Sequence, residues 1–246
     1  MVITAAQPAR GSRVFYVGIA GALLLFVLAG FAPSLAALPT GALPPLVQLH
    51  ALVFLAWMVL LILQASLVAR GRVAVHRRLG MSFVVLVPIM LVLGYLTAIF
   101  GARRGHPLWK SPEQVVPPGF PFEDSLEFLV VPLGDLAVFA PFVAIAFLFR
   151  GQPAIHKRAM LLATIGGMLP PATTRLPLGG GATQTLIAFV LFILFIAACI
   201  AHDYYERGRL HPLNLWGGIA LIGSVPLRAA VAHTNAWHSF AEWLTR

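Results

Sequence analysis

The sequence predicts an all-α fold, a bundle of seven transmembrane helices with the N-terminus inside the cell and the C-terminus outside. Hydrophobic residues make up 59% of the 246 residues and charged residues only 10%, which is more apolar surface than a soluble core of this length buries. The apolar runs are continuous and lack the alternation of membrane β-strands, so helices are the backbone form that satisfies its own hydrogen bonds in lipid. We therefore expect a single integral membrane domain over residues 1-246.

Seven apolar stretches, each of about 18 to 24 residues, are long enough to cross roughly 30 Å of hydrocarbon. The predicted spans are Val14 to Leu35, Leu46 to Ala69, Leu79 to Phe100, Leu126 to Phe149, Ala159 to Leu176, Thr183 to Ala201 and Leu213 to Ala232. The first stretch is longer than the apolar core of a typical signal peptide, and we interpret it as an uncleaved span.

Two similar basic turns separate these spans, Arg70 to Gly80 and Arg150 to Arg158. In each, Arg-Gly is followed by four residues and then by a histidine and two cations, and a shorter version begins at Arg207. Because the turns are short, we expect the second span to pack against the third and the fourth against the fifth. The repetition indicates either an ancient duplication or convergence on a good turn, and the sequence leaves both open.

The positive charges predict the orientation, because cytoplasmic loops retain lysine and arginine. The predicted inner side holds Arg10, Arg13, Arg70, Arg72, Arg77, Arg78, Arg150, Lys157, Arg158, Arg207 and Arg209. The outer side holds Arg103, Arg104, Lys110, Arg175 and Arg246. The long outer loop from Gly101 to Ser125 is either a solvated connector or a lid. A net charge of +9 in short clusters indicates membrane topology and the lipid bilayer as partner, not nucleic acid.

Three ionisable residues lie at membrane depth, where charge is costly and function is the default hypothesis: Asp135, Arg175 and Arg228. Counted along their spans, all three fall toward the outer side, so we expect one shared layer. Such a cluster would bind an anionic or carbonyl-bearing ligand. The alternative is an Asp135–Arg ion pair that fixes helix packing while the other arginine extends to the interface.

His76 and His156 occupy equivalent places in the two basic turns, on different helices and at one depth. A membrane-embedded b-type haem needs two such imidazoles, and Arg77, Arg78 and Arg158 would then meet its propionates. The alternative is a structural or interfacial role for both histidines. The sequence has one cysteine and no His-Glu-x-x-His motif, so no catalytic metal site is predicted.

A second stripe of polar and aromatic residues follows one face of the second span. His50, Trp57 and Gln64 recur at intervals of seven residues, which places them on roughly one helix face. We expect His50 and Gln64 to bind a ligand or, as the alternative, to hydrogen-bond between packed helices.

The segment that includes His50, Gln64 and the His76-Arg77-Arg78-Leu79-Gly80 turn resembles a group of bacterial multi-pass membrane proteins with an HRRLG turn and no assigned activity. Two later segments of this sequence also resemble signatures of that group, His156 to Met160 and Gly208 to Pro212. A fainter similarity is to membrane cytochrome b proteins of the ascorbate-reducible type, and to haem A synthase. This second resemblance implies haem b as cofactor, with His50, His76 and His156 on the second, third and fifth spans.

Together these features predict a bacterial inner-membrane protein that binds haem or quinone for electron transfer. Two alternatives remain. One is a non-catalytic accessory or structural subunit that packs against other membrane subunits, and the other is a small-solute transporter that uses the three intramembrane charges. The sequence identifies no substrate and does not decide whether the protein is an enzyme.

Overall fold

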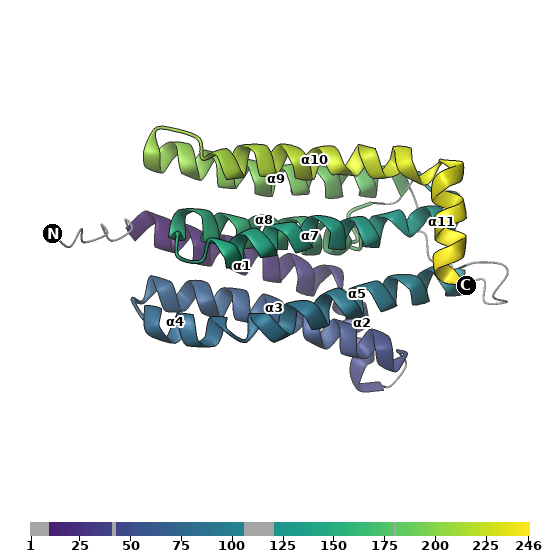
Figure 1. Cartoon of the computed structure of the whole chain (residues 1–246), viewed down its shortest axis with the longest axis horizontal. Coiled ribbons are helices and arrows are strands. Elements are labelled where there is room, and N and C mark those ends of the chain that lie inside the picture. Colours follow the sequence, from purple (N-terminus) through teal and green to yellow (C-terminus); the bar gives the residue numbers. More distant parts are fainter. Residues whose placement is uncertain (1–9, 41–42, 106–120, 180) are drawn as a thin grey trace.

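The computed structural model describes residues 10–40, 43–105, 121–179 and 181–246. Within these ranges every regular element is a helix, and the all-α prediction is confirmed (Figure 1). Most of the predicted outer loop, residues 106–120, lies outside the described residues, as do Lys110 and the side chain of Arg10.

Six long helices surround a seventh. The surrounding helices are α1 (Arg10–Gly30), α3 (Pro45–Ala69), α5 (Phe83–Gly105), α7 (Val130–Leu148), α10 (Pro212–Ala232) and α9 (Gly181–Arg207), each packed against the next in this order. Helix α9 closes the ring against α1. The central helix is α8 (Pro153–Thr173), which packs most extensively against α7 and also against α1, α9 and α10.

Short helices lie between the long ones and, in the case of α11, after the last of them. They are α2 (Ala32–Ala37), the 3-10 turn η1 (Leu38–Thr40), α4 (Val73–Gly80), α6 (Ser125–Phe128) and α11 (Asn235–Thr245). Helix α11 lies across the end of the bundle (Figure 1). The side chains of Asp124 and Thr234 cap α6 and α11 by accepting hydrogen bonds from the first-turn N–H groups.

Within the described residues, six segments are long and apolar enough to cross a membrane, and they indicate a multi-pass integral membrane protein. They are Arg13–Gly30, Pro45–Ala69, Phe83–Arg104, Ser125–Leu148, Gly181–Arg207 and Pro212–Ala232. The predicted fifth span corresponds to α8, which is not among them. Its first turns contain His156, Lys157 and Arg158, and its end contains two prolines.

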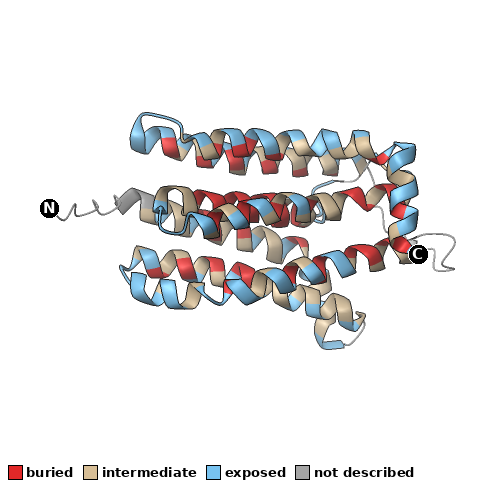
Figure 2. Cartoon of the chain, in the orientation of Figure 1, coloured by how far each residue is buried: buried red, intermediate tan, exposed pale blue. Residues whose placement is uncertain are grey.

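The position of α8 explains why it tolerates this composition. Nearly all of its residues from Arg158 to Met168 are buried, and the buried residues in Figure 2 concentrate on this helix. Gly166 and Gly167 let Leu221 of α10 and Phe139 of α7 approach its backbone. A helix that contacts protein on all sides is stabilised by small residues that let its neighbours pack closely, so its sequence can be less apolar than that of a lipid-facing helix.

Several predicted boundaries differ from the observed ones. The third span does not begin at Leu79, because α4 ends at Gly80 and α5 begins at Phe83. The sixth does not end at Ala201, because α9 continues to Arg207. The first ends at Gly30, where the chain turns into α2. The predicted neighbours, α3 with α5 and α7 with α8, do pack together.

Gly30 marks the closest backbone contact between α1 and α8, and it generates a first prediction. A Cβ at Gly30 would overlap the backbone carbonyl of Ala172, so Gly30→Ala forces the two helices apart and should cost about 1 to 3 kcal/mol of unfolding free energy. Denaturant unfolding in detergent micelles measures this loss. In the control, Gly21→Ala on the same helix, the new Cβ meets nothing within 4 Å and stability should hold or rise.

Candidate functional site

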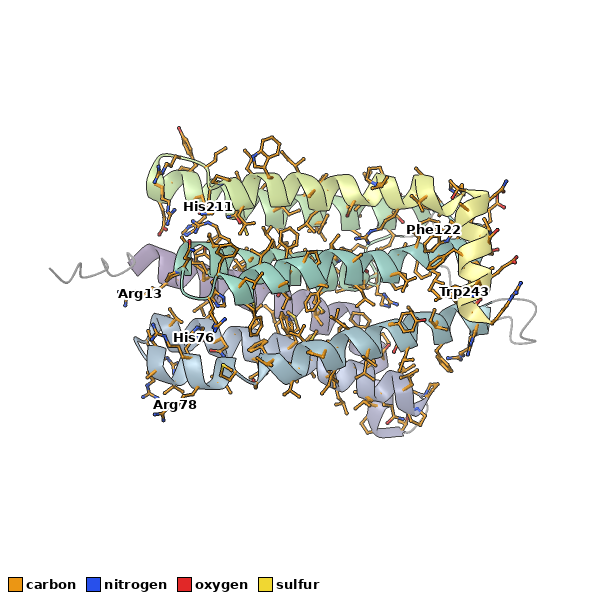
Figure 3. The ribbon with its side chains drawn as sticks, in the orientation of Figure 1. Arg13, His76, Arg78, Phe122, His211 and Trp243 are labelled. Carbon is orange, nitrogen blue, oxygen red and sulfur yellow. The ribbon has the colours of Figure 1, made fainter. Side chains whose placement is uncertain are left out.

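The turns α3–α4, α7–α8 and α9–α10 lie at one end of the bundle, which we call the basic end, and α11 lies at the other, the distal end. Figure 3 shows Arg13, His76, Arg78 and His211 at the basic end and Phe122 and Trp243 near the distal end. The two similar basic turns fold differently. Gly71 adopts a left-handed φ of 75° and leads into the separate helix α4, whereas Gly151 leads directly into α8.

The structure brings His76 and His156 together at the basic end, although they are 80 residues apart in sequence. Their ring centroids are 6.2 Å apart and the ring planes are inclined by 77°. Both side chains are partly buried. His156 Nδ1 lies 2.9 Å from the carbonyl oxygen of Ala146. A carbonyl only accepts, so Nδ1 carries the hydrogen and donates it, which leaves Nε2 of neutral His156 as an acceptor.

Gln64 fixes the opposite tautomer in His76. In the orientation that satisfies both ends of its amide, the Gln64 nitrogen donates to His76 Nδ1 (2.6 Å) and to the His76 carbonyl (3.1 Å). The amide oxygen accepts from the Gly80 N–H at 2.9 Å. His76 Nδ1 is therefore an acceptor and Nε2 carries the hydrogen. The pair consequently offers one Nε2 donor and one Nε2 acceptor.

His76 is held neutral by its surroundings. Burial, followed by the neighbouring His156, lowers the pKa of His76 below its ordinary value. If His76 were protonated, its Nδ1–H would face the amide N–H of Gln64, and two hydrogen-bond donors would repel each other. Neutral His76 is thus the form that fits this hydrogen-bond network.

Trp57 extends the polar face of α3 toward the centre of the bundle. It is fully buried, and its Nε1 donates to Thr164 Oγ1 of α8 at 3.2 Å. Gln64, two turns further along, is also buried. The predicted stripe on this span therefore joins α3 to α8 at Trp57 and to α4 at Gln64. Its third member, His50, stacks on Phe54 with ring centroids 4.0 Å apart.

Arg158 forms a buried ion pair with Asp203 of α9. Arg158 Nε lies 3.0 Å from both carboxylate oxygens, Nη2 donates to Oδ1, and both side chains are 1% exposed. Arg158 Nη1 donates to the carbonyl of Ala154 at 2.6 Å. Asn214 of α10 donates to Asp203 Oδ2 at 2.7 Å. This network joins α8, α9 and α10 and occupies the guanidinium that the sequence assigned to an external anion.

Arg77 and Arg78 differ from Arg158 because their side chains are exposed on α4. Figure 3 shows Arg78 pointing away from the bundle at the basic end. Both are placed to meet solvent or a charged membrane surface next to His76.

The three charges predicted at membrane depth lie toward the distal end, and two of them pair; Arg175 follows the end of α8 at Thr173. Arg228 Nη1 donates to Asp135 Oδ1 at 2.6 Å and to the carbonyl of Val131 at 3.3 Å. Gly134 makes room for this guanidinium, because a Cβ there would overlap it. Arg175 is exposed, donates to the Pro171 carbonyl at 2.6 Å and lies over the Phe31 ring at 4.8 Å. It is near enough to Asp135 for an electrostatic interaction.

A second carboxylate organises the distal end. Glu127 Oε1 lies 3.1 Å from His233 Nδ1 and 3.2 Å from His238 Nε2, which connects α6 to the end of α10 and to α11. Its other oxygen accepts from the Glu123 N–H at 2.8 Å. In the part of the chain that the structure describes, no group of three or more histidine, cysteine or acidic side chains is arranged to hold a metal ion.

The sequence analysis missed the acidic and amide partners of these sites. Asp203 lay beyond the predicted end of the sixth span at Ala201, and Asn214 follows the proline at the start of α10. The signal for Asp203 was its spacing. It lies four and seven residues beyond Cys199 and Ile196, both buried on the same face of α9.

No known protein family, curated protein sequence or solved structure matches the chain. The geometry of its own residues therefore carries the functional argument.

The buried ion pair predicts a large cost for removing one partner. Asp203→Ala leaves the Arg158 guanidinium buried without its counter-charge and should destabilise the protein by about 3 to 5 kcal/mol. Denaturant unfolding measures this cost. Glu206→Gln, one turn further along α9, removes an acid that meets His202 at 3.4 Å near the surface and should cost less than about 1 kcal/mol. The double variant Arg158→Met/Asp203→Leu should recover much of the lost stability, because it leaves no unpaired buried charge. Equal effects of Asp203→Ala and Glu206→Gln would contradict the assignment of Asp203 as the buried partner of Arg158.

The Gln64–His76 hydrogen bond predicts the titration of His76. NMR of histidine-labelled protein, assigned with His76→Phe, should give a midpoint below about 6.5, and Gln64→Glu should raise it by replacing a donor with an anionic acceptor. Because native His76 binds its proton less readily than the unfolded chain, its contribution to stability is complete above about pH 6.5 and is lost as the pH falls through the native pKa. A midpoint at or above 6.5 would refute the network.

Proposed function

We propose that the protein is a bacterial inner-membrane protein that binds a quinone head group beside His76 and His156, with one quinone oxygen meeting both rings, and takes part in electron transfer. The observation that carries the proposal is the complementary protonation of the pair. His76 Nε2–H would donate to a quinone carbonyl, and His156 Nε2 would accept from the hydroxyl of the corresponding quinol. One pair of imidazoles thereby recognises both redox forms of the ligand.

Haem b is the other ligand that the sequence predicted, and the residues fit it less well. An axial ligand must present a lone pair to iron, and His156 Nε2 does so. His76 Nε2 carries a hydrogen as long as Gln64 donates to Nδ1. Arg158, expected beside a propionate, is satisfied by Asp203. Quinone recognition requires no change in either hydrogen-bond network.

The proposed membrane arrangement has seven spans, with α8 as the fifth, and the basic end in the cytoplasm. Support comes from the length of α8, from its place inside the ring of six apolar helices, and from the exposed cations of α4. In this proposed arrangement, with α1 beginning at the basic end and α11 at the distal end, the N-terminus would be inside and the C-terminus outside. Membership in the HRRLG group remains part of the proposal, supported by the turn that holds His76.

The small-solute transporter has weaker support. Asp135 and Arg228 pair with each other, and Arg175 is exposed and donates to the last turn of α8, which matches the ion-pair alternative for these residues. An accessory subunit remains compatible with the apolar outer faces of the ring.

Quinone binding can be measured by calorimetry on the protein in lipid nanodiscs, with a short-tailed benzoquinone and its quinol as probes. His76→Phe should weaken the quinone and His156→Phe the quinol, each by about tenfold, because each loses one hydrogen bond in a low-dielectric site. His238→Phe, the same change at the distal end, should leave both affinities unchanged.

Two outcomes would overturn the proposal. In the first, neither His76→Phe nor His156→Phe changes the affinity for quinone or quinol. In the second, protein purified from its own host shows a Soret band that disappears in both variants, which would identify haem as the ligand of the pair.

A further inference from the structure

A groove runs between α1 and α3 at the basic end, on a different part of α3 from Gln64. It has a volume of about 670 Å³, within the range of roughly 300 to 1,000 Å³ typical of small-molecule sites. Its lining includes Arg13, Val17 and Gly18 of α1 and Ser66, Ala69 and Arg70 of α3. The residues of the proposed quinone site do not contribute to it.

The groove is charged at its head and apolar along its length. Arg13 and Arg70 lie where the two antiparallel helices reach the basic end, as Figure 3 shows for Arg13. Gly18 and Ser66 lie one turn or more deeper, roughly 6 to 8 Å along the helices. None of the lining residues is acidic, so the lining carries a net positive charge. This order, cations at the membrane surface and small or apolar residues below, is that of a phospholipid with its phosphate and acyl chain.

Gly18 keeps the groove open at a position where packing does not require glycine. A Cβ added to Gly18 meets nothing within 4 Å. Open space above Gly18 leaves room for an acyl chain along α1.

We propose that this groove binds one anionic phospholipid, with its phosphate between Arg13 and Arg70 and an acyl chain over Gly18 and Ser66. Arginine recognises phosphate through paired N–H donors, and basic sites between membrane helices bind anionic head groups in this way. The two arginines come from different helices, so the lipid bridges α1 and α3 at the membrane surface.

Native mass spectrometry of delipidated protein tests the proposal with dioleoylphosphatidylglycerol and dioleoylphosphatidylcholine as probes. Phosphatidylglycerol should bind about tenfold more tightly, and Arg13→Gln/Arg70→Gln should abolish that preference. The control Arg207→Gln/Arg209→Gln removes two charges from another turn at the basic end and should keep the preference. Gly18→Leu should weaken both lipids with every charge intact, and the variants should unfold at the wild-type denaturant concentration.

Three results would overturn the assignment. One is an unchanged preference in Arg13→Gln/Arg70→Gln. Another is an equal loss in Arg207→Gln/Arg209→Gln, which would reduce the effect to the overall surface charge. The third is displacement of the lipid by inorganic phosphate, which would make the groove a site for the free anion.

Discussion

The buried ion pair of Arg158 and Asp203 is the constraint on which the basic end depends. Moving both charges out of water costs several kcal/mol per ion, and close contact with additional hydrogen bonds is needed to offset it. Asn214 and the Ala154 carbonyl provide those bonds, so α8, α9 and α10 fit together in one register. That register fixes the first turn of α8, and with it His156 opposite His76.

Helix α8 transmits this constraint through the bundle. Thr164 receives the hydrogen bond from Trp57, Gly167 packs against Phe139, and Ala172 contacts Gly30. Each contact lies about one to two turns from the previous one along a single helix. These residues of α8 are thus positional, because they set where α1, α3 and α7 lie around it.

The sequence predicted the elements whose signals are local and periodic. Apolar length gave the long helices, and the repeated basic turns predicted that His76 and His156 would lie on one side of the bundle at one depth. The depth of Asp135 and Arg228 along their helices likewise predicted one layer, in which the structure pairs them. These inferences needed only the rise of a helix and the direction of the chain.

The remaining features depend on partners that sequence spacing does not identify. Gln64 meets His76 because α4 folds back as a separate helix after Gly71, although the sequence indicated one span from Leu79. Arg158 faces inward because it pairs with Asp203. Asp203 lies near the end of α9, beyond the most apolar stretch of that helix. Tertiary packing decides whether Arg158 pairs with an external anion or with an internal carboxylate. The residue type alone is compatible with both.

The composition of α8 also bears on how the chain enters the bilayer. Helix α8 holds His156, Lys157 and Arg158 in its first turns and is not among the segments apolar enough to cross a membrane, so it would insert poorly by itself. The turn before it is only a few residues long, and α7 is among the apolar segments. Helices α7 and α8 would therefore enter as one helical hairpin. In that case the cations of α8 would stay at the entry side until Asp203 arrives with α9, and the central helix would reach its final environment only after a later part of the chain has been synthesised.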